Sequence, residues 1–448
     1  MPENPVRKPV RIGILGAGVS GLSAAYFLQS QSGDVNTDDA ETGDIKIEVD
    51  IYEAADQTGG LARSFKWHGI WCDIAPHRLY TQDKKLLQEL MRLVPMHEVK
   101  RSSKIFIRNK WINDPVNPFE ILLKFFPKKS LSILFSYVKA RLTSAGDQSS
   151  FEGMVLSRFG SGLNEMFFKP YSEKLFGIPA NKISAEWAKR KIRISGVKDM
   201  LKKDTRIYFK YFYYPDRGGY GAISQKLYQS VAENVHLQTK LTAIKQHKDS
   251  ASGVTQSYTC SFEDGNGKSF TRDFDILIST LPLNAFSQLL GLDIKLAFRP
   301  ARLVYLNVNK SNLTGMHWFY VADAAYRINR VAEFKNFSLD YDAADNSVIC
   351  VEVTAQENFS VANVISELER LGTLRAVDVI DTKIIDVPSA YPIYDLEYSN
   401  ETGRAFAYFK QHPNLYLLGR NAQFSHVDVD EIFGAAKQMT EELVASLS

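Results

Sequence analysis

The stretch VRIGILGAGVSGLSAAYFLQS at residues 10–30 constrains the fold more than any other part of the chain. An apolar run leads into Gly16-x-Gly18-x-x-Gly21, and apolar residues then recur at helical spacing. Strand, glycine turn and helix in this order are typical of a dinucleotide-binding unit. Gly16 permits the tight turn, Gly18 lets a pyrophosphate approach the backbone, and Gly21 lets the helix pack against the strand. The N–H groups at the start of the helix would then bind the diphosphate.

A carboxylate follows the next predicted strand. The run IEVDIY at residues 47–52 is strand-like, and Glu53 ends it. A carboxylate there suits the two ribose hydroxyls of an adenosine moiety and repels a 2′-phosphate, so the site disfavours NADP. Glu53 comes 32 residues after Gly21, where about 20 is usual. The extra length falls in residues 33–44, which hold five acids and no base and are interpreted as a surface loop.

The order of predicted strands and helices indicates an α/β fold, α+β overall, built from two domains that the chain visits in turn. With 448 residues the chain is long enough for two or three structural units. We expect a Rossmann-like nucleotide-binding domain and a discontinuous mixed substrate domain. The boundaries expected for the nucleotide-binding domain are residues 1–80, 213–285 and 401–448. The substrate domain then takes residues 81–212, which hold a helical basic segment, and 286–400.

Composition excludes several classes of protein. The chain is 45% hydrophobic and 23% charged, as an ordinary globular protein is. Its first residues do not resemble a signal peptide, and no stretch of about 18 uncharged apolar residues predicts a spanning helix. Cys72, Cys260 and Cys350 have no metal-binding spacing and fit free thiols, and the eight histidines form no close pair. We therefore expect no metal site and a cytoplasmic protein.

Charge is unevenly distributed along the chain. The net charge is +3, but residues 99–212 hold 23 Lys+Arg against 9 Asp+Glu, a net of +14, which leaves −11 elsewhere. This asymmetry indicates an anionic small-molecule substrate, a phosphate-bearing ligand or an acidic membrane surface. No nucleic-acid-binding motif accompanies it, so nucleic acid is not expected as a partner. The basic, apolar residues 120–142 fit either peripheral membrane contact or a helix pair that faces the core.

Several motifs together resemble a known superfamily. They read GAGVSGLSAAY, YEAADQTGGLARS, DIAPHRLYTQD and NLYLLGRNAQFSHVDVDEI, and they are spread over nearly the whole chain. The chain resembles the flavin-dependent superfamily that includes amine oxidases, protoporphyrinogen oxidase and UDP-galactopyranose mutase, and it is most similar to mutase-like members. This resemblance implies FAD as the cofactor.

The resemblance also implies which residues contact the FAD. They are assigned to the pyrophosphate, the adenosine and the flavin end, and they comprise Gly16, Ala17, Gly18, Ser20, Gly21, Glu53, Ala54, Gly60, Leu61, Ala62, Arg63, Pro76, His77, Leu241, Gly419, Arg420 and Asp430. His77 matches a histidine whose turn packs against the isoalloxazine ring. Ala75 replaces the usual glycine of that turn.

The same resemblance implies residues that contact the substrate. Arg190 and Arg330 match mutase positions that contact a substrate phosphate, and arginine suits bidentate phosphate or carboxylate recognition. Arginines in surface ion pairs are the alternative for both. Tyr391 and Tyr394 are candidates for the aromatic pair by which amine oxidases enclose an amine, with core packing as their alternative.

One segment departs from the mutase pattern. Phe424, His426 and Val427 stand where the mutase has tyrosines, which favours another substrate. The main hypothesis is therefore an FAD-dependent oxidoreductase in which a small anionic or amphipathic molecule transfers a hydride to flavin N5, with His77, Arg330 and His426 as the catalytic candidates. Either histidine suits acid–base chemistry near neutral pH. The second hypothesis is a UDP-galactopyranose mutase-like isomerase that uses reduced flavin. The third is a membrane-surface protein whose flavin is structural.

Overall fold

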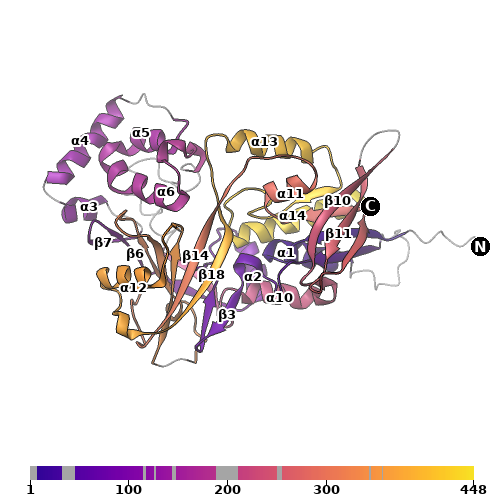
Figure 1. Cartoon of the computed structure of the whole chain (residues 1–448), viewed down its shortest axis with the longest axis horizontal. Coiled ribbons are helices and arrows are strands. Elements are labelled where there is room, and N and C mark those ends of the chain that lie inside the picture. Colours follow the sequence, from indigo (N-terminus) through magenta and orange to yellow (C-terminus); the bar gives the residue numbers. More distant parts are fainter. Residues whose placement is uncertain are drawn as a thin grey trace, which may run out of the picture.

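The computed structural model describes residues 8–32, 46–114, 118–125, 128–143, 148–187, 210–249, 255–342, 345–355 and 357–447. The described part mixes helices and sheets, as the sequence predicts. Figure 1 shows an elongated molecule in which the two larger sheets lie side by side along the long axis. Arg190 and the acidic stretch 33–44 lie outside the described residues.

A five-stranded parallel sheet carries the glycine motif. Its order is β19-β13-β1-β2-β9, with β1 at its centre. The strand bounds are β19 (Leu415–Leu417), β13 (Ile276–Ser279), β1 (Val10–Leu15), β2 (Ile47–Tyr52) and β9 (Val235–His236). Segments from the start, middle and end of the chain thus meet in one sheet, which is why the sequence pattern predicts a discontinuous domain. The exact domain boundaries stay a prediction.

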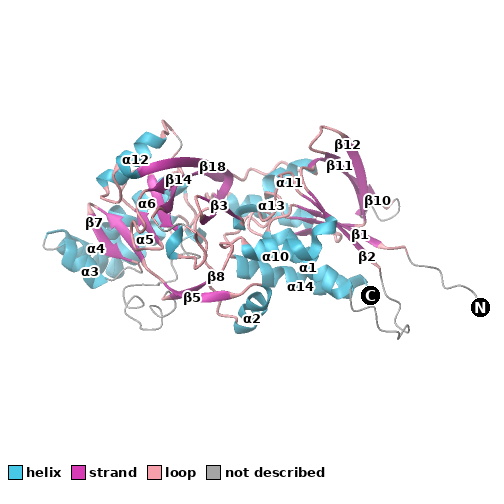
Figure 2. Ribbon diagram, turned by 90° about the horizontal axis from the view of Figure 1, so that it is seen from below, coloured by secondary structure: helices cyan, strands magenta, loops and turns pink. Residues whose placement is uncertain are grey.

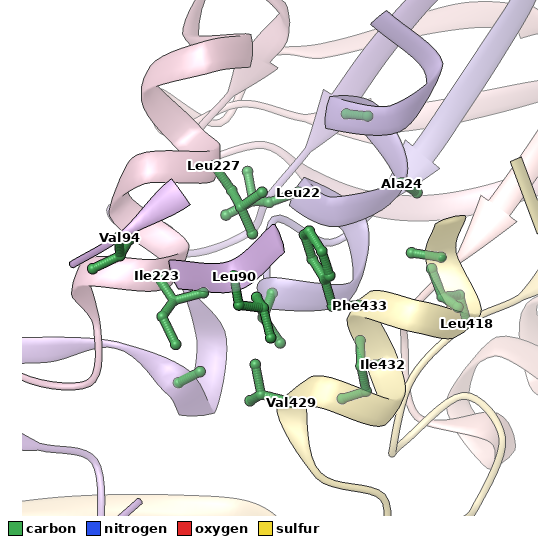
Figure 3. Packing of buried hydrophobic residues seen from close by; sticks show 14 of the residues in the cluster. Leu22, Ala24, Leu90, Val94, Ile223, Leu227, Leu418, Val429, Ile432 and Phe433 are labelled. Atoms are coloured by element: carbon green, nitrogen blue, oxygen red, sulfur yellow. The ribbon is translucent and has the colours of Figure 1, made fainter. Parts of the chain in front are cut away.

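Helices cover one face of this sheet. They are α1 (Val19–Ser32), α2 (Lys84–Leu93), α10 (Ala222–Val231) and α14 (Val429–Leu447). Their apolar side chains form one core cluster with the sheet, and Figure 3 shows Leu22 of α1, Leu227 of α10 and Phe433 of α14 turned toward one another. The Phe27 and Phe433 rings lie 4.8 Å apart between centroids, which joins the first helix to the last.

A three-stranded antiparallel sheet packs on the other face. It consists of β10 (Lys240–Lys248), β11 (Thr255–Glu263) and β12 (Ser269–Phe274). The ring of Tyr52 stacks on Phe262 at 4.1 Å, which closes the contact between the two sheets. This part of the molecule therefore has three layers, and its central strands β1 and β13 are mostly buried between the other two.

The second large sheet is mixed and has seven strands in the order β18-β14-β17-β16-β15-β6-β7. All neighbours are antiparallel except β15 and β6. The strand bounds are β18 (Val379–Pro392), β14 (Phe298–Val308), β17 (Ser347–Val353), β16 (Ile328–Glu333), β15 (Trp318–Val321), β6 (Ser103–Ile107) and β7 (Lys110–Asn113). Two short ribbons connect the sheets: β3 (Ser64–Trp67) with β4 (Ile70–Asp73), and β5 (Met96–Lys100) with β8 (Tyr211–Pro215).

The remaining helices lie mostly beside the seven-stranded sheet. Figures 1 and 2 place α3 (Pro118–Phe125), α4 (Lys128–Thr143), α5 (Phe151–Leu163) and α6 (Lys169–Phe176) together at the end of the molecule away from the two termini. The others are α11 (Leu283–Leu289), α12 (Val361–Arg370) and α13 (Tyr398–Phe409). No helix among the described residues is long and apolar enough to cross a membrane.

Candidate active site

The glycine turn after β1 has the form that its sequence predicts. Gly16 has a φ of +103°, which a residue with a side chain rarely adopts. A Cβ built on Gly21 would lie 2.0 Å from the carbonyl oxygen of Gly16, so α1 packs directly on the turn. A Cβ on Gly18 would make an ordinary contact of 3.9 Å with the Cα of Gly60, so packing within the protein does not require glycine there. The motif predicts a pyrophosphate beside Gly18.

Glu53 is held in place by backbone donors. Its carboxylate accepts the N–H of Ala17 at 2.8 Å and the N–H of Ala55 at 2.9 Å. A carboxylate has about four acceptor positions, so two remain for ribose hydroxyls. The backbone of Gln238 and Thr239 also bonds this segment, through the carbonyl oxygens of Ala55 and Glu53. Ala54 lies between them, and Leu241, the predicted adenine contact, follows two residues after Thr239 in β10.

A second glycine segment lies against the first. The N–H of Gly59 donates to the carbonyl of Ala17 at 2.8 Å, and Gly18 and Gly59 form an isolated parallel bridge. The short helix η2 (Gly60–Ala62) follows, and Arg63 then donates to the carbonyl of Gly60. This contact places the predicted set Gly60, Leu61, Ala62 and Arg63 beside the glycine turn.

Gly419, which follows β19, lies against the start of α1. Gly419 has a φ of +96°, and a Cβ on it would lie 2.1 Å from the hydroxyl oxygen of Ser20. Two buried polar atoms nearby have no hydrogen-bond partner among the described residues: Nε of Arg420 and Oδ1 of Asp430, in the first turn of α14. Burial raises the pKa of Asp430 to about 6. Glycine turns that meet beside unpartnered polar atoms fit a bound dinucleotide.

His77 follows a strained turn. Ala75 has a φ of +61°, so the turn keeps the left-handed conformation that suits the glycine of related proteins, at an energetic cost. Nδ1 of His77 donates to the carbonyl of Ala75 at 2.9 Å, and its ring stacks on Tyr220. Burial, with the positive charge of Arg330 second, lowers the pKa of His77 to about 4. The imidazole is therefore neutral at pH 7, which weakens its case as a proton donor.

The buried carboxylate of Asp73 binds residues that pack against this turn. Asp73 accepts from the hydroxyl of Ser64 at 2.6 Å, from the hydroxyl of Tyr214 and from the N–H of Tyr220 at 2.9 Å. The hydroxyl of Tyr305 donates to the carbonyl of Asp73 at 2.7 Å. Burial raises the pKa of Asp73 to about 6 despite these donors. Since Tyr220 stacks on His77, Asp73 fixes the position of the His77 ring.

Arg330 forms an ion pair across two strands. It lies opposite Glu352 in the β16–β17 register, and its Nη2 contacts the Glu352 carboxylate at 2.6 Å. The hydroxyl of Tyr391 donates to the other oxygen of Glu352, also at 2.6 Å. Burial lowers the pKa of Arg330, but the carboxylate of Glu352 outweighs it and raises that pKa well above its usual range. The side chain of Arg330 is 19% exposed, so the pair is not closed off.

Aromatic side chains surround this ion pair. Tyr320 on β15 is the register partner of Arg330. The ring of Tyr171 on α6 packs edge-on against the Tyr320 ring, with 6.1 Å between the ring centroids. Burial raises the pKa of Tyr171 and of Tyr391, so both remain phenols. Tyr171, Tyr320 and Glu352 were not among the site residues predicted from the sequence. Glu352 carried a signal, because it is an acid inside the wholly buried strand β17, and such acids are rare unless paired.

The C-terminal segment completes the cluster. The guanidinium of Arg420 donates to the carbonyl of Ala390 at 2.8 Å and lies 5.4 Å from the Tyr391 ring centroid. His426 stacks on Tyr391, with 6.3 Å between ring centroids. Its backbone N–H donates to the hydroxyl of Tyr394 at 2.8 Å.

Tyr391 and Tyr394 have different surroundings. Tyr394 is 1% exposed, lies in the core cluster and stacks on Trp187. The packing alternative therefore suits Tyr394, while Tyr391 lies in the charged cluster. The structure thus brings together His77, Arg330, Tyr391, Arg420 and His426, and leaves Arg190 outside the described residues.

This fold and these glycine turns are typical of a dinucleotide-binding flavoprotein. The family model described as flavin containing amine oxidoreductase matches residues 19–377. The chain belongs to this family of oxidoreductases, and its cofactor is FAD.

Individual relatives are more distant. The chain is 25% identical over 188 residues to coproporphyrinogen III oxidase of Staphylococcus aureus, which covers 39% of this chain and 38% of that protein. It is 25% identical over 295 residues to the L-amino-acid oxidase BmooLAAO-I of Bothrops moojeni, which covers 61% of this chain and 52% of that oxidase. The chain thus matches about half or less of the length of these relatives.

One solved structure shows the shared fold over almost the full chain. The crystal structure of reduced UDP-galactopyranose mutase superposes with a TM-score of 0.76 and 19% identity, covering 98% of this chain and 94% of that one. This likeness establishes the fold alone. The superfamily resemblance read from the motifs is confirmed by the family match.

Proposed function

We propose that the protein is an FAD-dependent oxidoreductase that oxidises a small anionic or amphipathic molecule. The observation that carries the proposal is the cluster between the two sheets, where His77 and Arg420 from the nucleotide-binding part meet Arg330 and Tyr391 from the seven-stranded part. When bound, FAD supplies hydride acceptance at N5, and the protein supplies binding, orientation and a dry environment.

Each group in the cluster has a chemical task in this proposal. Arg330, oriented by Glu352, would bind an anionic group of the substrate. Tyr171, Tyr320 and Tyr391 would pack on its apolar part and exclude water. The neutral His77 would pack beside the flavin, and its Nε2 lone pair remains a weak proton acceptor because its pKa is low.

The second candidate is a sugar-nucleotide isomerase that uses reduced flavin, and Arg330 favours it because a guanidinium suits a substrate phosphate. The segment that differs from the mutase weakens this candidate. Phe424 is 2% exposed and packs in an apolar cluster, so it offers no hydroxyl to a diphosphate. Oxidation of a smaller anion therefore remains our first proposal.

Anaerobic mixing of the purified FAD-bound protein with candidate substrates separates the two. L-amino acids, amines, coproporphyrinogen III and UDP-galactopyranose would be added in turn while the absorbance of oxidised flavin is followed. Loss of that absorbance with substrate alone supports the oxidoreductase. Isomerisation of UDP-galactopyranose only after chemical reduction of the flavin supports the isomerase and overturns the first proposal.

Arginine variants would locate the substrate site in the same assay. Arg330→Met should raise the substrate concentration needed for flavin reduction at least tenfold, which is about 1.4 kcal/mol of binding energy. Arg302→Met is the matched control, because Arg302 is also an ion-paired strand arginine but contacts Asp386 in an exposed pair. Equal effects of the two substitutions would contradict the role given to Arg330.

A further inference from the structure

Helix α4 carries an apolar stripe that faces away from the protein. Phe135, Val138 and Leu142 occupy positions i, i+3 and i+7, which lie on one side of a helix. They are 72%, 47% and 79% exposed. Leu123 of the neighbouring α3 is 80% exposed. These are four of the twelve exposed large hydrophobic residues of the described chain, and they fall within 20 residues.

The opposite side of α4 is already occupied. Ile133 is 8% exposed, and a Cβ on Gly162 of α5 would lie 2.8 Å from its Cα. A Cβ on Gly160 would lie 2.6 Å from the backbone of Ser136, so the two helices approach with almost no room between them. At 3.6 residues per turn, Ile133 lies about opposite the stripe and Ser136 lies on the flank of the helix, roughly 125° from the centre of the stripe. The stripe is therefore not the core-facing side of this helix pair.

The segment that carries the stripe has a positive net charge. Residues 103–143 contain eight Lys+Arg and two Asp+Glu, a net of +6. Of the two acids, Glu120 pairs with Lys124 and Asp114 pairs with Arg101. Lys139 is exposed on α4 next to the stripe, and Arg108 and Lys110 are exposed on the adjacent β6–β7 hairpin.

We propose that the stripe of Phe135, Val138 and Leu142, with Leu123, docks on an anionic lipid bilayer. An apolar helix side bordered by Lys and Arg is the composition of a helix that lies in the membrane interface. Anionic headgroups attract the surrounding cations, while the apolar side chains enter the acyl boundary. Three large, exposed apolar residues on one side of a helix form a contiguous apolar patch, and such patches mark interaction sites. The proposal does not depend on the flavin chemistry.

Co-sedimentation with lipid vesicles tests this surface. The full-length FAD-bound protein would be mixed with vesicles of equal parts phosphatidylserine and phosphatidylcholine, or of phosphatidylcholine alone. We expect at least tenfold stronger partitioning onto the anionic vesicles, reduced by salt because screening weakens the lysine contribution. Equal binding to both compositions, or none, would overturn the proposal.

Variants assign the binding to the stripe. Phe135→Ser/Leu142→Ser should lower partitioning at least tenfold, and Lys139→Gln should lower it about fivefold. The matched control is Val377→Ser/Ile380→Ser, which removes two exposed apolar residues elsewhere, 83% and 57% exposed. All positions are exposed, and circular dichroism would verify folding. Unchanged binding by the first variant refutes the proposal.

A second copy of the chain is the competing occupant. Sedimentation velocity over a range of protein concentrations would detect it. Self-association that disappears in Phe135→Ser/Leu142→Ser, without vesicle binding by the wild type, would identify the stripe as an interface between copies and overturn the membrane proposal.

Discussion

At the residue scale, the side chains of the candidate site are held in place by other protein groups. Glu53 already accepts two backbone N–H groups, and Arg330 is oriented by Glu352. Asp73 fixes Tyr220, which in turn stacks on His77. Such preorganisation lowers the entropy cost of ordering these side chains when a ligand binds. Gly18 and Gly21 of the glycine turn, by contrast, act because they have no Cβ.

Alanine substitutions should separate the two glycine roles. Gly18→Ala adds a methyl whose nearest neighbour, the Cα of Gly60, lies at an ordinary contact distance of 3.9 Å, so folding should be unaffected while the methyl meets the predicted pyrophosphate and lowers FAD affinity at least tenfold. Gly21→Ala places the methyl 2.0 Å from a carbonyl oxygen and should cost about 3 kcal/mol of folding stability or more. Urea unfolding and FAD titration would measure both. Wild-type FAD affinity in Gly18→Ala would contradict the assignment.

The low pKa of His77 should appear in the pH dependence of stability. Its folded pKa is about 4 against an ordinary 6.5, so between these values the unfolded chain binds the extra proton. Stability therefore falls as pH decreases from 6.5 to 4, by at most about 3 kcal/mol from this group. Denaturation of FAD-free protein across this range should show the fall weakened in His77→Gln. His247→Gln, at an exposed histidine, should leave it unchanged.

Asp73 acts in the opposite direction over a similar range. Its pKa is raised to about 6, so the folded state binds the extra proton between pH 3.8 and 6, and stability falls as pH rises through that range. The contributions of His77 and Asp73 to the pH dependence of wild-type stability therefore partly cancel. The variant difference, rather than the wild-type slope, is what tests His77.

At the element scale, one lysine joins the helical end to the strands that carry the site. Nζ of Lys174 on α6 lies within hydrogen-bond distance of four carbonyl oxygens of the β15–β16 hairpin, those of Val321, Asp323, Tyr326 and Ile328, and its three N–H groups are shared among them. Tyr320 and Arg330 flank this loop. The lysine therefore sets the distance between Tyr171 on its own helix and the two residues on the hairpin.

Removing the ammonium should loosen this connection. Lys174→Met keeps the length of the side chain but leaves buried carbonyl groups without a donor, so we expect a loss of about 2–3 kcal/mol in unfolding free energy. Hydrogen exchange should increase in β15 and β16. Lys169→Met, on the same helix but in a partly exposed pair with Glu152, should change stability by less than about 1 kcal/mol. Similar losses in both variants would argue against the role of Lys174.

Some elements could be predicted from the sequence, and others could not. β1 and β13 are short apolar runs and β2 alternates apolar and acidic residues, so all three follow from the sequence pattern. β18 was not predicted, because it is an edge strand, is mostly exposed and contains Pro388 where its register shifts. The Glu352 pair also escaped prediction, because strand register decides which residues lie opposite each other and a single sequence does not reveal it.

At the scale of the whole molecule, the cofactor site draws on segments far apart in sequence. The glycine turn, Glu53, His77 and Gly419 lie in four such segments. The motif matches found these segments because each has a local signature. The cluster proposed to face the substrate lacks such signatures apart from Arg330, and for that reason Tyr171 and Tyr320 were found only in the fold.

Ligand binding should therefore stabilise the entire fold. FAD at one hundred times its dissociation constant should raise the unfolding free energy by about 2.7 kcal/mol, because only the folded chain assembles the site. Thermal melts with added FAD and with added NADP would measure this. NADP should give little stabilisation, since Glu53 repels a 2′-phosphate. Equal protection by both would contradict the role of Glu53.

The contact between α1 and α14 has a consequence for biosynthesis. The first helix packs on the last, with Phe27 against Phe433, and β19 joins the same sheet from residues 415–417. A ribosome adding about 5–20 residues per second reaches α14 roughly 20–80 s after α1. During that interval the apolar side of α1 lacks its partner. The nascent chain should therefore present a chaperone-binding surface near its beginning that disappears only when its closing helix emerges.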